Sequence, residues 1–416
     1  MSSSSSISNE QFETFVIVGG GIAGLATAVA LQRVGLKSLV LERADSLRTT
    51  GAALTLMTNA WRALDVLGVA QSLRLKHPQL QGAQVTSFPS AFTKQISYTG
   101  SGKCGDHEVR CVQRSFLLET LAKELAPGTI RFNTKVVSIQ QSTNSSLTIV
   151  KLGDGALIKA KVLIGCDGGN SVVADWLGLQ APSLSGRSGI RGLATYPEGH
   201  KFGPKVKLYW GEHLRAGFVP CNDKDVYWFT TQSSLPSDSD IGRDPKSILE
   251  KAMEILGDYP EEILDIVKKT QIDTLTLTPL SLRWPWAVLF GKLCKGNVCV
   301  AGDAMHPMTP DLGQGGCSTL EDAVVLGRCL GEATTVMNGL EEEKKIEEAL
   351  KKYVEERRWR SFGLISGAYI TGVVQQGSGG VITRFLRDKF LSRKLSENLM
   401  NQADFDCGTL SSCTPT

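Results

Sequence analysis

The sequence lacks any hydrophobic run long enough to cross a bilayer. A transmembrane helix needs about 20 consecutive apolar residues, and the longest candidate, residues 364–374, is interrupted by Ser366, Gly367, Thr371 and Gly372. Residues 1–11 form a serine tract with no basic residue and no apolar core, which is unlike a secretory signal and predicts a flexible tail. We therefore expect no transmembrane segment and a cytoplasmic protein.

The sequence also lacks a charge imbalance and a metal-binding pattern. Its 45 Lys+Arg and 42 Asp+Glu residues leave a net charge of +3, too balanced to indicate a nucleic-acid partner. The ten cysteines include no C-x-x-C pair, and neither Cys104 with His107 nor Cys294 with Cys299 has an evident second ligand pair. We expect no metal site, and free buried thiols in a reducing compartment.

The chain is nevertheless long enough to bury a substantial core. It has 416 residues, of which 42% are hydrophobic and 21% are charged, and this length favours two or three domains.

The first informative segment joins a strand to a glycine-rich turn. Residues 15–18 predict a buried parallel strand, and the following residues fit the spacing G-x-G-x-x-G. In this pattern Gly19 permits the tight turn, Gly21 lets the backbone approach a pyrophosphate, and Gly24 allows close packing of helix on strand.

The residues after this turn predict a helix, 23–34, and a second strand, 38–41, that leads into Glu42. The helix start offers free N–H groups and a partial positive charge to a phosphate. Glu42 is placed to accept hydrogen bonds from a ribose diol. The segment predicts a dinucleotide site, and Glu42 disfavours NADP, but NAD and FAD stay open.

In two later segments a predicted strand is again followed by an acidic residue. Residues 161–164 predict a strand leading into Gly165-Cys166-Asp167-Gly168, and residues 296–300 predict one leading into Gly302-Asp303. A loop rich in glycine, 310–316, then precedes a helix. An acid at this end of a parallel strand can hold a ligand sugar, and the helix start can stabilise a ring that becomes anionic, as reduced flavin does.

In this order the three segments resemble the single-component FAD-dependent aromatic hydroxylases and monooxygenases, which are similar to para-hydroxybenzoate hydroxylase. The stretch from Gly302 to Cys317, followed by Glu321-Asp322-Ala323, is most similar to plant salicylate-hydroxylase-like monooxygenases and zeaxanthin epoxidase. The resemblance covers about residues 15–330, with the middle sheet matched loosely. It implies an α/β fold: a Rossmann-like FAD-binding domain, an inserted antiparallel-sheet substrate domain and C-terminal helices.

The resemblance also implies which residues bind FAD. Those implied for the ADP part are Gly19, Gly21, Ala23, Gly24, Glu42 and Arg43. Gly51 and Ala52 resemble the start of a mobile flavin loop, Arg114 opens a helix that touches FAD, and Asp167 lies in a motif that serves FAD and NAD(P)H. Asp303 would hold the ribityl chain. The loop that would carry the isoalloxazine contains Pro310, Gly313, Gly315, Gly316 and Cys317, with the last two amides facing the pyrimidine edge.

One departure from the family concerns the second segment. The family motif usually continues Ser-x-Val-Arg, whereas this chain has Ser171-Val172-Val173-Ala174. The absence of arginine at position 174 puts the handling of the reduced nicotinamide in doubt, but it does not affect FAD.

Between residues 191 and 282, short alternating strands (206–210, 216–220 and 226–230) predict an antiparallel sheet. The resemblance implies that this sheet covers the substrate pocket. Candidates for substrate contact, each with a core or surface position as the alternative, are Tyr209, His213, Arg215 and Phe218. For His306 we favour a structural role in shaping its turn.

The implied reaction uses NAD(P)H as a transient reductant and O₂. Oxygen passes through a C4a-hydroperoxyflavin to a small electron-rich substrate, aromatic or olefinic, by hydroxylation or epoxidation. No Ser/His/Asp arrangement or carboxylate pair stands out, so no catalytic side chain is predicted and the cofactor carries the chemistry. Two alternatives stay open: a flavin reductase or dehydrogenase on the same fold, and a non-catalytic FAD-binding interaction protein.

We expect the FAD-binding domain to comprise residues 12–75, 106–185 and 286–335, and the substrate domain residues 76–105 and 186–285. C-terminal helices are expected over 336–400, with flexible tails at 1–11 and 401–416. Residues 384–394 form a basic amphipathic pattern that predicts a helix packed on the substrate domain, with contact to a membrane surface as the alternative.

Overall fold

The computed structural model describes residues 10–47, 52–87, 92–142, 145–211, 213–233, 244–334, 340–376 and 400–410. Gly51 and the basic segment 384–394 lie outside the described residues.

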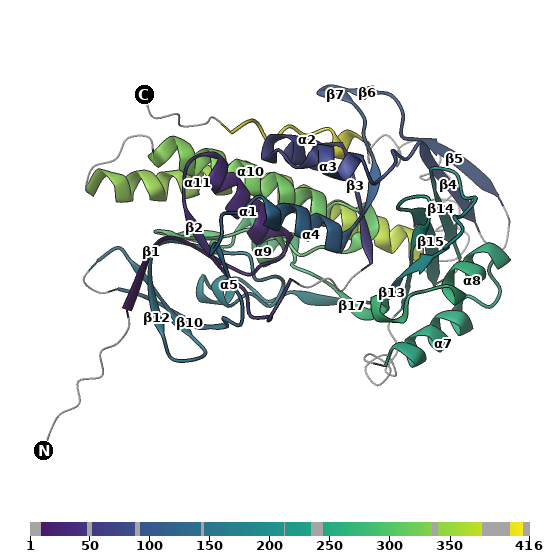
Figure 1. The fold of residues 1–416 in the computed structure, drawn as a ribbon, viewed down its shortest axis with the longest axis horizontal. Helices are drawn as coiled ribbons and strands as arrows, with labels where there is room; N and C mark the ends of the chain where they lie inside the picture. The colour runs from purple at the N-terminus through teal and green to yellow at the C-terminus, as the bar shows by residue number, and fades with distance from the viewer. Residues whose placement is uncertain are drawn as a thin grey trace, which may run out of the picture.

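The first layer is an eight-stranded mixed sheet (Figure 1). Its path is β10 (Val136–Gln141), β11 (Thr148–Leu152), β12 (Leu157–Gly165), β1 (Glu10–Val18), β2 (Ser38–Leu41) and β9 (Ile130–Arg131). Strand β12 also pairs with β19 (Val298–Val300), which pairs with β18 (Cys294–Lys295). Strands β1, β12 and β19 run parallel, and Val18, Gly165 and Val300 are aligned across them. The three glycine–acid segments therefore leave the sheet at one edge.

Two long helices pack closely beside this sheet. Helix α1 (Ile22–Arg33) lies against α10 (Gly315–Thr334), where a Cβ added to Gly327 would lie 2.7 Å from the Cβ of Ala30. Around them lie α2 (Thr58–Leu67), α4 (Arg114–Lys123) and the 37-residue α11 (Leu340–Gln376). Helix α5 (Val172–Trp176) packs instead on β10, β12 and β19 of the sheet.

The second layer is a seven-stranded sheet at the other end of the molecule (Figure 1). Its order is β17 (Thr276–Leu282), β13 (Ser183–Thr195), β16 (Asp225–Ser233), β15 (Leu214–Pro220), β14 (Lys205–Trp210), β4 (Gly82–Ser87) and β5 (Thr93–Ser97). All neighbours are antiparallel except β14 and β4. One face packs on α7 (Pro245–Ile255) and α8 (Glu261–Lys268) around buried Phe218 and Trp228. The predicted α/β fold with a second, mainly antiparallel sheet is confirmed, and the substrate role of that sheet stays a prediction.

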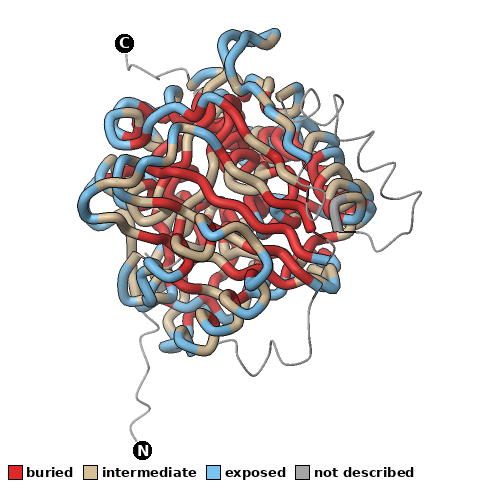
Figure 2. The backbone as a smooth tube through the Cα atoms, turned by 90° about the vertical axis from the view of Figure 1, so that its right-hand side faces the viewer, coloured by how far each residue is buried: buried red, intermediate tan, exposed pale blue. Residues whose placement is uncertain are grey.

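The remaining elements are short. They are α3 (Ala70–Arg74), β3 (Ala53–Leu56), β8 (Arg110–Gln113), β6 (Ser101–Gly102), β7 (Gly105–Asp106), α9 (Pro285–Leu289) and the 3₁₀ turns η1 (Ile272–Thr274), η2 (Gly302–Ala304) and η3 (Pro310–Leu312). Figure 2 shows that buried backbone runs through the interior while exposed segments lie mainly on the outer turns. The cysteines in the described part of the chain are free thiols, most of them buried.

The structure differs from the prediction at both tails. Strand β1 begins at Glu10, inside the expected tail. A flexible tail from residue 401 is wrong for residues 401–410, because Ala403 and Cys407 are buried and Asp404 forms an ion pair with Arg62 at 3.1 Å. These contacts are tertiary, so no local periodicity signals them. The remaining domain boundaries stay a proposal.

Candidate functional site

The first turn has the backbone that the glycine spacing requires. Gly19 has φ +103°, and a Cβ there would lie 2.5 Å from the carbonyl oxygen of Cys166. A Cβ at Gly24 would lie 1.8 Å from the carbonyl oxygen of Gly19, so only glycine lets α1 approach the turn. A Cβ at Gly21 would meet nothing within 4 Å. The start of α1, which has no side-chain cap and no acidic residue in its first turn, therefore borders open space.

That open space is a cavity of about 210 Å³. It is lined by six of the predicted site residues: Gly19, Gly21, Glu42, Arg43, Arg114 and Asp167. It also has lining residues that the sequence did not identify, among them Lys135 and Asn170. Asn170 lies two residues after the Asp167-Gly168 pair, and this position in the sequence is the signal that indicates it. Lys135 had no such signal, because it reaches the cavity through the placement of β10.

Glu42 is held rigidly at the cavity wall. Its side chain is 6% exposed. One carboxylate oxygen accepts a hydrogen bond from the N–H of Gly20 (2.7 Å), and the other accepts one from the N–H of Ala44 (2.8 Å). Two backbone donors fix the orientation of the carboxylate beside the phosphate turn, where the ribose-binding role was predicted.

Asp167 follows β12 and faces the same cavity. Its Oδ2 accepts a hydrogen bond from the N–H of Val172 (2.7 Å), while its buried Oδ1 has no partner among the described residues. Burial raises the pKa of this carboxyl above its usual value, and hydrogen bonds from Ser171 and the backbone lower it in part. Ser171 caps α5, as predicted, by accepting the N–H of Ala174 (2.9 Å). A buried acceptor without a partner fits a ligand hydroxyl.

The third segment turns sharply beside α1. Gly302 has φ +61°, and a Cβ there would lie 2.8 Å from the Cβ of Ala23. Ala23 therefore packs against the turn rather than lining the cavity. Asp303 is exposed to solvent. Partial desolvation by neighbouring atoms raises the pKa of its carboxyl, and the charges of His306 and Arg114 lower it in part.

The glycine-rich loop lies between this turn and α10. Pro310 is exposed at the start of η3, and Gly313 has φ +64°. Helix α10 begins at Gly315, and a Cβ at Gly316 would lie 3.0 Å from Leu54 of β3. The buried Cys317 thiol accepts the N–H of Met57 at 3.4 Å, which ties the helix start to the segment after β3.

Ala52 and Arg114 meet beside this loop. The N–H of Arg114 donates to the carbonyl oxygen of Ala52 (3.3 Å) where β3 and β8 pair. Their FAD contacts, like those of the loop residues, stay predictions. The structure groups the predicted residues into the cavity, the turn that carries Asp303 and the glycine-rich loop.

The register of the second sheet decides which side chains face the glycine-rich loop. Arg215 lies at 3.7 Å from Asp311 of η3, so its face is turned toward the loop. Tyr209 and Phe218 belong to the core shared with α7 and α8, and the Tyr209 hydroxyl donates to Glu262. Of the four candidates only Arg215 is placed toward the loop. The fourth candidate, His213, is exposed at a tight turn with φ +62°.

Tyr227 and Phe229 lie on the same face of the sheet as Arg215, and these three side chains form what we call the wall. Arg215 pairs across the sheet with Thr231, and Phe229 pairs with Arg191. Tyr227 and Phe229 stack with ring centroids 5.8 Å apart, and the guanidinium of Arg215 lies 5.6 Å from the Phe229 ring.

Fold and site together define a class of protein, the FAD-dependent oxidoreductases that carry a second sheet beside the glycine-rich loop. Residues 13–366 match the family described as FAD binding domain, and the chain belongs to that family. The predicted cofactor FAD is thereby confirmed, and use of NAD(P)H is typical of the family.

Individual relatives carry the same indication. The chain is 46% identical over 403 residues to Monooxygenase 2 of Arabidopsis thaliana, covering 95% of this chain and 97% of the relative. It is 26% identical over 358 residues to the chloroplastic zeaxanthin epoxidase of an Oncidium hybrid cultivar, covering 83% of this chain and 52% of that protein. A variant of HpxO from Klebsiella pneumoniae, complexed with FAD, has the same fold: TM-score 0.79, 22% identity, covering 94% and 98% of the two chains.

These findings make the chain an FAD-dependent monooxygenase, as predicted. None of the helices in the described part of the chain is long and apolar enough to span a membrane.

Proposed function

We propose that the chain transfers one oxygen atom from O₂ to a small, electron-rich aromatic substrate, with NAD(P)H as the reductant. The observation that carries this proposal is the wall formed by Arg215, Tyr227 and Phe229, which is turned toward the loop of Asp311. Aromatic side chains with one buried cation suit a flat ring that bears a polar oxygen.

We infer that FAD lies along the three glycine–acid segments. The open space at Gly21, the Asp167 oxygen without a described partner and the accessible Asp303 fit such a ligand. Gly19, Gly21, Glu42 and Arg43 would hold the ADP part, with Arg114 and Asp167 beside it. Asp303 would hold the ribityl chain, and the segment Pro310–Cys317 the ring.

When bound, FAD supplies electron transfer from NAD(P)H and the activation of O₂. The side chains of this protein supply position and exclude water. Tyr227 and Phe229 are partly buried and would shield the substrate from solvent. Holding the substrate ring at a fixed distance from the loop makes the transfer effectively intramolecular.

Arg215 is the residue that we propose selects the substrate. It is 9% exposed. Burial lowers the pKa of its guanidinium, the Asp311 carboxylate raises it, and the nearby charge of Arg187 lowers it again. An incoming phenolate or carboxylate would stabilise this buried cation, so we expect acidic or phenolic aromatic substrates.

The test is a product screen with the flavin-loaded protein. NADH and NADPH oxidation and O₂ uptake are measured with aromatic acids, phenols and indoles, and products are analysed by mass spectrometry for the gain of one oxygen. Reduction of the flavin without any oxygenated product would indicate a reductase or dehydrogenase. A flavin that neither nicotinamide reduces, with any substrate present, would indicate the non-catalytic alternative. The predicted cytoplasmic location is checked by fractionation of the tagged protein.

A further inference from the structure

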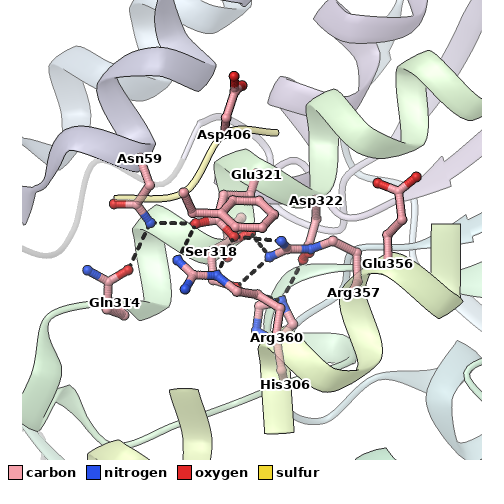
Figure 3. A network of polar contacts seen from close by, with 12 residues as sticks. Asn59, His306, Gln314, Ser318, Glu321, Asp322, Glu356, Arg357, Arg360 and Asp406 are labelled. Atoms are coloured by element: carbon pink, nitrogen blue, oxygen red, sulfur yellow. Dashed lines mark hydrogen bonds and ion pairs between the residues drawn. The ribbon is translucent and has the colours of Figure 1, made fainter. Parts of the chain in front are cut away.

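A buried network of charged and polar side chains contacts both ends of the segment 302–314, here called the flavin loop, and lies outside the cavity (Figure 3). Its centre is Arg357 of α11, which is fully buried. The Nε of Arg357 donates to Asp322 (2.6 Å), its Nη1 lies 2.6 Å from Glu321, and its Nη2 donates to the Ser318 hydroxyl (2.8 Å). Arg360, one turn along the same helix, donates to Glu321 (2.8 Å).

The network holds the first end of the flavin loop through Asp322. The Oδ2 of Asp322 accepts the N–H of Gly302 (2.8 Å) and lies 2.6 Å from Nε2 of His306. Gly302 and His306 flank the turn that presents Asp303. The position of this turn is therefore fixed by a carboxylate that Arg357 itself holds.

The network holds the second end through Glu321. The side-chain amide of Asn59 in α2 donates to Glu321 (2.5 Å) and to the Gln314 side chain (2.9 Å). Gln314 directly precedes the start of α10 and is fully buried. Glu321 and Asp322 are adjacent in the sequence, and Arg357 contacts both of them. Arg357 therefore connects the two ends of the segment 302–314.

Electrostatics make this arrangement specific. Burial alone would raise the pKa of Asp322, but the charges of His306 and Arg357 lower it to about 2. Burial also opposes ionisation of Glu321, and Arg357 and Arg360 lower its pKa below the usual value. A buried ion network is favourable only when all of its partners are in place, so other conformations of the loop lose these contacts.

We propose that Arg357, Glu321, Asp322 and Asn59, the Arg357 network, are positioning residues that preorganise both ends of the flavin loop for FAD. None of them lines the cavity. A loop held in its binding conformation loses less conformational entropy when the ligand binds. Loosening the network therefore weakens FAD binding and alters the surroundings of the ring. This inference rests on the proposed position of the flavin along residues 302–317.

The first test replaces Arg357 with lysine, which keeps the charge but cannot bridge two carboxylates and a hydroxyl in one plane. We expect the FAD dissociation constant of R357K to rise about tenfold or more, as happens when outer partners of metal ligands are removed. We also expect the absorbance bands of the bound flavin to shift. The matched control is R358K, because Arg358 donates to carbonyl groups around α9, those of Val288, Leu289 and Gly291, and not to the carboxylates of the network.

A second variant keeps the test decisive if R357K fails to fold. Asn59→Leu breaks the connection between Glu321 and Gln314 while both arginines stay paired, so we expect a folded apoprotein with severalfold weaker FAD binding and a shifted flavin spectrum. Wild-type affinity and spectrum in the folded variants would overturn the inference. Asp303→Ala separates the proposed position of FAD from the proposed positioning role of the network. If this variant retains FAD, the proposed position of the flavin is wrong. If it loses FAD while N59L and R357K bind normally, only the positioning role is wrong.

Discussion

Replacing Gly21 with alanine separates ligand binding from folding. The residue has φ −81° and ψ −169°, an extended conformation open to alanine, and the added methyl would meet no protein atom within 4 Å. The smaller entropy of the unfolded chain would stabilise the protein by about 0.4–1 kcal/mol. Loss of glycine at the N-cap would cost about 0.5–1 kcal/mol. We therefore expect the unfolding free energy of the apoprotein to stay close to the wild-type value.

Binding of FAD should respond very differently to the same methyl group. At the proposed site it would lie between the pyrophosphate and the N–H groups that start α1. Hydrogen bonds to a charged group contribute about 1.5–3 kcal/mol each, so losing one corresponds to a dissociation constant about 10- to 100-fold higher. Gly203→Ala is the matched control, because its methyl also meets no atom within 4 Å and it lies in the loop before β14.

The assay needs flavin-free protein of both variants. Thermal unfolding of the apoprotein gives the stability, and quenching of FAD fluorescence on titration gives the dissociation constant. If G21A binds FAD as tightly as the wild type and G203A do, the turn at Gly21 does not contact the pyrophosphate and the assignment of this cavity to FAD is refuted.

Three further predictions concern other parts of the site. Asp303→Ala should lose bound FAD and the yellow colour, and full flavin absorbance after purification would contradict the assignment. Arg215→Met should raise KM for acidic or phenolic substrates about tenfold or more, whereas Tyr209→Phe on the opposite face should not; equal effects would rule out a substrate role for Arg215. The pKa of Asp322, about 2 against an ordinary 3.8, means that its contribution of about 2 kcal/mol is present above about pH 4 and lost as the pH falls toward 2. The pKa of His306 is raised, because the charge of Asp322 outweighs burial, so its contribution is present below about pH 6.5 and lost as the pH rises through the raised value. Thermal unfolding midpoints measured against pH should show both slopes. Asp322→Asn should remove the acid slope and weaken the slope from His306, because Asp322 causes both pKa shifts; an unchanged acid slope in that variant would contradict the pairing.

The strand-to-turn segments could be predicted because their physics is local. Gly19 and Gly24 are required by atoms a few residues away or by the adjacent strand, so the spacing alone identifies them. The parallel strands then bring Asp167 and Asp303 to one edge of the sheet with no further information.

The substrate face could not be predicted in the same way. Period-2 alternation shows that Arg215 and Phe218 lie on opposite faces of β15, but it does not show which face is covered. Helices α7 and α8 decide this by burying Phe218 and leaving Arg215 beside Asp311.

The sequence by itself determined the class of cofactor, the strand-to-turn geometry and the likeness to a monooxygenase family. Tertiary structure alone decided that Arg215 faces the loop, that Lys135 lines the cavity and that Arg357 holds Glu321 and Asp322. The physical reason is the distance along the sequence over which the deciding interactions act. A glycine turn is specified by dihedral angles and contacts within a few residues, whereas a side chain on a distant strand or helix is placed by packing that depends on the whole chain.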